Sequence, residues 1–73
     1  MKPAEITVGE TYRGRNGVLR TVTGYGAHED WIMWARTADR LPLGGFVNKH
    51  CTSRKGFAAW ALERIPPSPG KPT

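Results

Sequence analysis

Two stretches near the start of the chain, residues 8–13 and 18–23, contain β-branched and aromatic residues among polar ones. Such residues are typical of β-strands. The dipeptide Asn16-Gly17 between them is a strong short-range signal for a β-hairpin. We therefore expect the two stretches to pair as antiparallel strands.

Repulsion between two arginines determines the register that we expect for this hairpin. A two-residue loop would place Arg13 directly opposite Arg20, and like charges in that position destabilise a sheet. A three-residue loop, residues 15–17 with Gly17 in the left-handed region, shifts the pairing so that Tyr12 opposes Arg20. We prefer this second register, in which Arg13, Arg15 and the threonines face away from the core. The side chains expected on its buried face are Tyr12, Val18 and Val22.

Two further strands and a helix are expected from residue 31 onward. Residues 31–36 carry apolar side chains on both faces, so this strand is either covered on both sides or partly exposed as a contact surface. Residues 46–51 predict a fourth strand. Ser53, with Thr52 as its rival, is the expected N-cap of a helix that runs to about Ile65 and stops at two prolines.

These elements predict one α+β or mostly β domain over residues 1–65, followed by a Pro-rich flexible tail at residues 66–73. Nine glycines and six prolines in 73 residues suit short strands and turns better than a helical bundle. Two architectures stay open. One is a small SH3-like barrel, and the other is a three- or four-stranded antiparallel sheet with the C-terminal helix packed across it.

Net charge narrows the choice of partners. The chain carries a formal charge of +5 and has a pI of about 10.0, which is typical of domains that meet nucleic acid or acidic proteins. Its one cysteine, Cys51, rules out an internal disulfide, and no signal peptide is visible, so we expect a cytoplasmic protein. The longest apolar run, residues 31–35, is too short for a transmembrane helix.

Residues that could carry chemistry are few. A zinc site usually needs four regularly spaced ligands, and the chain offers two histidines and one cysteine without such spacing. His50 and Cys51 are adjacent, so on a strand they would point to opposite faces and could not act as base and nucleophile. No glycine-rich phosphate-binding motif occurs. We expect neither an enzyme nor a metal, cofactor or small-molecule substrate.

Binding surfaces therefore become the main candidates. If the fourth strand runs beside the hairpin, the basic residues of the hairpin and of the helix start form one anion-binding face, and aromatics of residues 31–36 can stack on bases. The nucleic-acid-binding residues expected on this hypothesis are Arg13, Arg15, Arg20, Lys49, Arg54 and Lys55.

The alternative is a protein-binding module, because Trp and Arg are enriched at interface hot spots. It requires at least one exposed tryptophan. The interface residues expected on this hypothesis are Trp31, Met33, Trp34, Arg36 and Trp60.

A family resemblance adds a possible origin. The chain reads VGETYR at residues 8–13, RTV at residues 20–22 and FAAWA at residues 57–61, with Gly17 between the first two. This pattern resembles short bacteriophage and prophage proteins of unknown function, over about residues 8–62. The resemblance implies a small SH3-like barrel with a closing helix. It also implies a phage accessory role, either DNA-associated regulation or inhibition of a host enzyme or defence complex, as anti-CRISPR proteins do. No binding residue is carried over, and the polar segment at residues 37–45 departs from the pattern.

Overall fold

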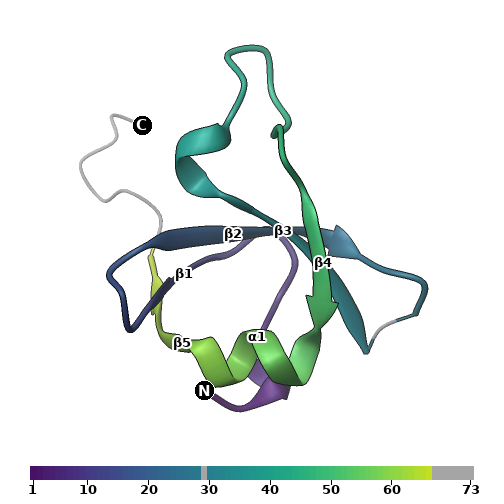
Figure 1. Cartoon of the computed structure of the whole chain (residues 1–73), viewed down its shortest axis with the longest axis vertical. Coiled ribbons are helices and arrows are strands. Elements are labelled where there is room, and N and C mark those ends of the chain that lie inside the picture. Colours follow the sequence, from purple (N-terminus) through teal and green to yellow (C-terminus); the bar gives the residue numbers. More distant parts are fainter. Residues whose placement is uncertain (29, 67–73) are drawn as a thin grey trace.

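The computed structural model describes residues 1–28 and 30–66. Five strands form one antiparallel sheet in the order β4-β3-β2-β1-β5 (Figure 1). The strands are Thr11–Gly14 (β1), Leu19–Tyr25 (β2), Trp31–Arg36 (β3), His50–Ser53 (β4) and Ala61–Ile65 (β5). The helix α1 (Arg54–Trp60) joins β4 to β5, and short 3-10 helices lie at Pro3–Glu5 and Thr37–Asp39.

The predicted class, a small α+β sheet domain with a helix near its C-terminus, is confirmed. The sheet has five strands instead of three or four. No strand pairing between β4 and β5 closes a barrel within residues 1–28 and 30–66. Instead α1 spans the two edge strands and covers the concave side of the bent sheet (Figure 1). Of the predicted tail at 66–73, residues 67–73 lie outside the described part of the chain.

The helix is shorter than the sequence predicted. Ser53 caps it as expected, since its hydroxyl accepts a hydrogen bond from the Gly56 N–H at 3.0 Å. The helix ends at Trp60, however, and residues 61–65 pair with β1. In so short a segment, apolar spacing fits a helix and a strand alike. The backbone N–H and C=O groups along the edge of β1 need hydrogen-bond partners, and residues 61–65 supply them only when they form a strand.

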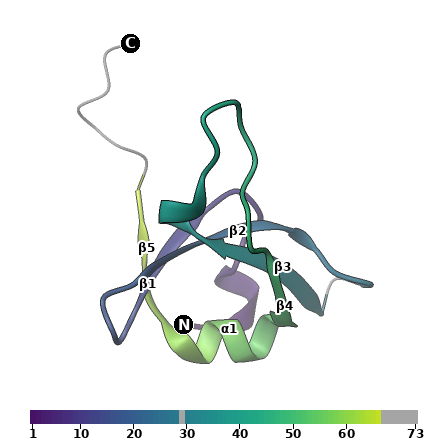
Figure 2. The same ribbon diagram turned by 45° about the horizontal axis from the view of Figure 1, so that its top comes forward.

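The fourth strand also starts later than residue 46. Residues 37–49 leave the sheet as an arm between β3 and β4, which stands clear of the body in Figures 1 and 2. Asn48 has a φ of 55°, which interrupts the extended run that the sequence suggested. Pairing with β3 begins only at His50.

The hairpin has the predicted register. Tyr12 lies opposite Arg20, and Gly17 has a φ of 78° in the left-handed region. One expectation for its outer face is wrong, because Thr21 is buried. Its hydroxyl is hydrogen-bonded to those of Thr11 at 2.8 Å and Thr37 at 2.9 Å. The 3-10 helix after β3 covers this face, which hydrophobic patterning does not reveal.

The core fills the space between the sheet and α1. Tyr12 lies at its centre, fully buried and packed edge to face on Phe57, with ring centroids 5.5 Å apart. Its hydroxyl donates to the Glu5 carbonyl at 3.0 Å and accepts from the Thr7 N–H at 2.8 Å. The other core residues are Ile6, Val22, Ile32, Ala58 and Ala61. One tyrosine thus connects the sheet, the helix and the N-terminal segment.

Gly14 has a separate structural role at the end of β1. It is buried, and a Cβ at this position would overlap the indole ring of Trp60. The absence of a side chain lets the Trp60 ring approach the strand closely.

Replacing Tyr12 with phenylalanine should lower the free energy of unfolding by about 1–2 kcal/mol, because the Glu5 carbonyl and the Thr7 N–H lose their partner. Urea unfolding measures the change. Tyr25→Phe is the matched control, since Tyr25 is 54% exposed. Equal stability of the Tyr12 variant and the control would show that the buried hydroxyl contributes nothing.

Replacing Gly14 with alanine should cost about 1–3 kcal/mol of stability, because the new methyl group displaces the Trp60 ring. Gly24→Ala is the control, since a Cβ at Gly24 meets no atom within 4 Å. Thermal unfolding of the two variants should separate them. An unchanged melting temperature for Gly14→Ala would refute the close packing of the Trp60 ring against β1.

Candidate nucleic-acid interface

Arg20 lies between two tryptophan rings. Its guanidinium carbon is 4.0 Å from the ring centroid of Trp34 on β3 and 4.2 Å from that of Trp60 at the end of α1. On the other side of β3, His50 of β4 stacks on Trp34 at 4.5 Å with an interplanar angle of 30°. We call His50, Trp34, Arg20 and Trp60 the arginine–aromatic stack. Cation–π attraction holds the guanidinium in a fixed plane.

Hydrogen-bond donors for a ligand can come only from the two terminal nitrogens of the guanidinium. Its Nε is buried without a hydrogen-bond partner among the described residues, out of reach of a ligand. No described residue accepts a hydrogen bond from its two terminal nitrogens either, although Arg20 as a whole is only half-buried. Partial burial lowers the pKa of Arg20 from its ordinary value, but an arginine stays charged at neutral pH. The guanidinium of Arg20 is therefore charged and held in one orientation, and its terminal nitrogens form no hydrogen bond with the described residues.

Arg36 on β3 lies directly opposite Arg20 in the β2–β3 register. Like charges in a cross-strand pair destabilise a sheet. The Nε of Arg36 lies 3.4 Å from Oδ2 of Asp39, so one carboxylate offsets part of the repulsion. The Arg36 side chain is still 60% exposed. An anion placed between the two guanidinium groups would relieve the remaining repulsion.

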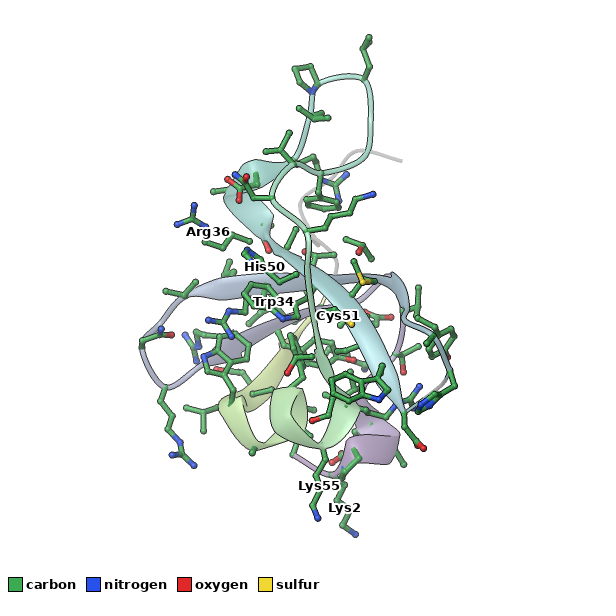
Figure 3. All side chains as sticks on the ribbon, turned by 45° about the vertical axis from the view of Figure 1, so that its right-hand side comes forward. Lys2, Trp34, Arg36, His50, Cys51 and Lys55 are labelled. Carbon is green, nitrogen blue, oxygen red and sulfur yellow. The ribbon has the colours of Figure 1, made fainter. Side chains whose placement is uncertain are left out.

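Further basic residues lie near this pair at the base of the arm. Arg36 is the last residue of β3, while Lys49 and His50 stand at the point where the chain returns to the sheet. Figure 3 shows Arg36, His50 and Trp34 close together on one side of the molecule. We call Arg20, Arg36, Lys49 and His50 the arm-root face.

The six basic residues predicted to bind nucleic acid do not share one surface. That expectation required the fourth strand to run beside the hairpin, but β4 pairs with β3 and is separated from β2 by it. The six residues instead divide among three places. Arg13 and Arg15 lie on the hairpin, Arg20 and Lys49 on the arm-root face, and Arg54 and Lys55 at the start of α1.

Arg13 is further occupied by an ion pair with Glu63 on β5. Both side chains of this pair are about half exposed, so the contact adds little stability, but it places a carboxylate beside the arginine. Arg13 is therefore a less favourable position for a phosphate than Arg20.

The start of α1 borders an open depression of about 450 Å³. Its lining contains the carboxylate of Asp30 as well as Arg54 and Lys55. The guanidinium carbon of Arg54 lies 5.3 Å from the Tyr25 ring. Figure 3 places Lys55 at the end of the molecule away from Arg36 and His50. Mixed charge makes this depression a poor match for a polyanion.

The predicted protein interface is also divided. Alternation along β3 puts Trp31 and Met33 on one face of the sheet, and Trp34 and Arg36 on the other. The expected exposed tryptophan is Trp31, at 42%. Trp34 and Trp60 are half-buried in the arginine–aromatic stack, and Trp60 also contacts Phe57. The five residues do not form one continuous patch.

Sequence reasoning missed the role of His50, which it treated as the end of a strand. Its pairing partner Trp34 lies sixteen positions earlier, across the arm, and no local pattern predicts that register. Cys51, its neighbour, faces the opposite side of β4, in register with Met33. The predicted separation of these two side chains is confirmed.

Comparison with known proteins assigns neither a family nor a function to the chain. No protein-family model matches the chain, and neither a curated protein nor a solved structure shows significant similarity to it. The resemblance to phage proteins stays a prediction. Residues 1–28 and 30–66 contain no group of three or more metal-binding side chains. Within the same residues, no helix has both the length and the apolar character needed to cross a bilayer.

Replacing Arg20 with lysine should keep the charge but lose the flat group between the two indole rings. We expect a loss of about 1 kcal/mol in unfolding free energy, and a change in tryptophan fluorescence. Arg15→Lys on the exposed hairpin turn is the matched control and should alter neither. Identical emission spectra for the wild type and Arg20→Lys would contradict the sandwich.

Proposed function

We propose that this domain binds nucleic acid, and that phosphate groups of the nucleic acid contact the arm-root face. The observation that carries the proposal is the Arg20 guanidinium, held between Trp34 and Trp60 and directly opposite Arg36. A guanidinium forms two parallel hydrogen bonds with a phosphate, and fixing its plane in advance lowers the entropy lost on binding. An incoming phosphate also removes the repulsion between the two arginines.

Whole-molecule charge favours the same ligand. The net charge of +5 attracts a polyanion from a distance, and each phosphate neutralised releases counterions from the nucleic acid. The single cysteine favours a cytoplasmic location, where nucleic acid is abundant. A phage accessory protein that associates with DNA would fit this role.

The state of the tryptophans favours backbone recognition over base stacking. Bases stack on aromatic rings whose faces are free, but Trp34 already contacts Arg20 and His50, and Trp60 contacts Arg20 and Phe57. The alternative of a phage-type inhibitor or adaptor receives less support, because four of its proposed residues are split between two faces of β3 and the fifth, Trp60, lies on α1.

Replacing Arg36 with glutamine should weaken binding by about tenfold and reduce the slope of log affinity against log salt by about one, as expected for one lost phosphate contact. Fluorescence anisotropy of a labelled 16-base-pair duplex, titrated at several salt concentrations, measures both quantities. Lys55→Gln is the control, because it removes one positive charge at the far end of the molecule.

The comparison of these two variants separates a local site from general attraction. Equal losses in the two variants would contradict a site at the arm root and leave only non-specific attraction by the net charge. Wild-type affinity that does not change with salt would contradict phosphate recognition altogether.

A further inference from the structure

We propose that the arm carries an apolar wedge, Leu43, which inserts between two base pairs of duplex DNA from the minor groove while the arm-root face holds the phosphates. This inference rests on the proposed nucleic-acid function. It goes further by naming the form of the ligand and the change imposed on it, a kink at one base step.

The tip of the arm is a defined turn that presents Leu43 outward. The Gly44 N–H donates to the Leu41 carbonyl at 3.0 Å, which closes a β-turn with Pro42 and Leu43 at its two central positions. A second hydrogen bond, from the Leu41 N–H to the Gly45 carbonyl at 2.9 Å, completes the tip. Gly44 and Gly45 have φ values of 103° and 81°, so this path needs glycine. Proline fixes the backbone next to Leu43.

Apolar surface is concentrated on this projection. Leu43 is fully exposed at 102%, and Leu41 and Val47 are 41% and 42% exposed. A single exposed leucine is ordinary. Three exposed aliphatic side chains on one projecting arm suggest a contact surface, and the arm stands clear of the sheet in Figure 2.

The stem of the arm is fastened to the sheet. The Thr37 hydroxyl is hydrogen-bonded to that of buried Thr21 on β2 at 2.9 Å. Further out, the Val47 N–H donates to the Asp39 carbonyl at 3.1 Å, and the Arg40 guanidinium carbon lies 5.0 Å from the Phe46 ring centroid. The tip is therefore held at a set position relative to Arg20 and Arg36.

The positive charge of the arm favours a negatively charged partner for its tip. The span 36–50 contains three basic residues, Arg36, Arg40 and Lys49, and one acidic residue, Asp39, a difference of +2. A second copy of a chain with net charge +5 would be repelled, whereas duplex DNA would be attracted along the whole stem. Apolar side chains flanked by Arg and Lys are the means by which minor-groove proteins unstack and kink a base step. Pyrimidine–purine steps unstack most easily, so a central TA step should be preferred.

The test uses the full chain and a 30-base-pair duplex with a central TA step and a fluorescent dye at each end. Energy transfer between the dyes measures bending, and anisotropy of the same duplex measures affinity. The variant is Leu43→Ser, and the control is Leu62→Ser, since Leu62 is 57% exposed on β5, outside the arm. Thermal unfolding of both variants checks that the fold is intact.

We expect the wild type and Leu62→Ser to raise energy transfer on binding. Leu43→Ser should bind with an unchanged salt slope, about tenfold lower affinity and no rise in energy transfer, because one leucine is no longer buried. Replacing the TA step by AA should reduce bending by the wild type.

Other outcomes overturn the wedge. Salt-dependent binding without bending, or bending that survives Leu43→Ser, would refute the wedge and leave the proposed function standing. Absence of binding at low salt would refute both. Capture of one stoichiometric protein from a nuclease-treated lysate by the wild type and not by Leu43→Ser, together with an unbent duplex, would make the arm a protein-binding element instead.

Discussion

The position of Arg20 between Trp34 and Trp60 is the constraint on which the proposed binding surface depends. A guanidinium in that place needs ring faces from β3 and from the end of α1 at the correct separation. Trp60 can pack against Arg20 because Gly14 has no side chain and because α1 ends at Trp60. Residues 61–65 then add a strand to β1, which keeps the end of the helix against the sheet.

The remaining architecture brings positive charge and the arm to the same end of the sheet. Antiparallel pairing of β2 with β3 aligns Arg20 with Arg36, and pairing of β3 with β4 brings His50 onto Trp34. The arm starts after Arg36 and returns to the sheet at His50, so its base lies at the edge of the arginine–aromatic stack. A ligand held by the arginines would lie beside the arm. The proposed phosphate binding and the proposed insertion of Leu43 are thus parts of one geometry.

Local chemistry made the hairpin predictable from the sequence. Repulsion between Arg13 and Arg20, and the need for a positive φ at Gly17, led to the register that the structure has. The cap at Ser53 and a core centred on Tyr12 and Val22 followed from equally local rules. The class of the fold, strands followed by a helix, depended only on such signals.

Contacts between distant residues could not be predicted in the same way. Residues 61–65 have an apolar spacing that fits a helix, and only the free edge of β1 makes them a strand. His50 gains its role from a partner across the arm, and Thr21 is buried by a segment sixteen residues away. The candidate site was therefore predicted in part. Arg20 and Lys49 belong to it, Arg36 had been placed in the alternative interface, and the other basic residues lie elsewhere.

The three tryptophans provide a direct test of the binding surface, because each gives one indole N–H resonance in a nitrogen–proton correlation spectrum. Trp34 and Trp60 contact Arg20, whereas Trp31 faces the other side of β3. Titration with a short DNA duplex at low salt should shift the indole signals of Trp34 and Trp60 together with the Nε signal of Arg20, and leave Trp31 in place. Movement of the Trp31 signal alone, or of none of the three, would contradict nucleic-acid binding at the arginine–aromatic stack.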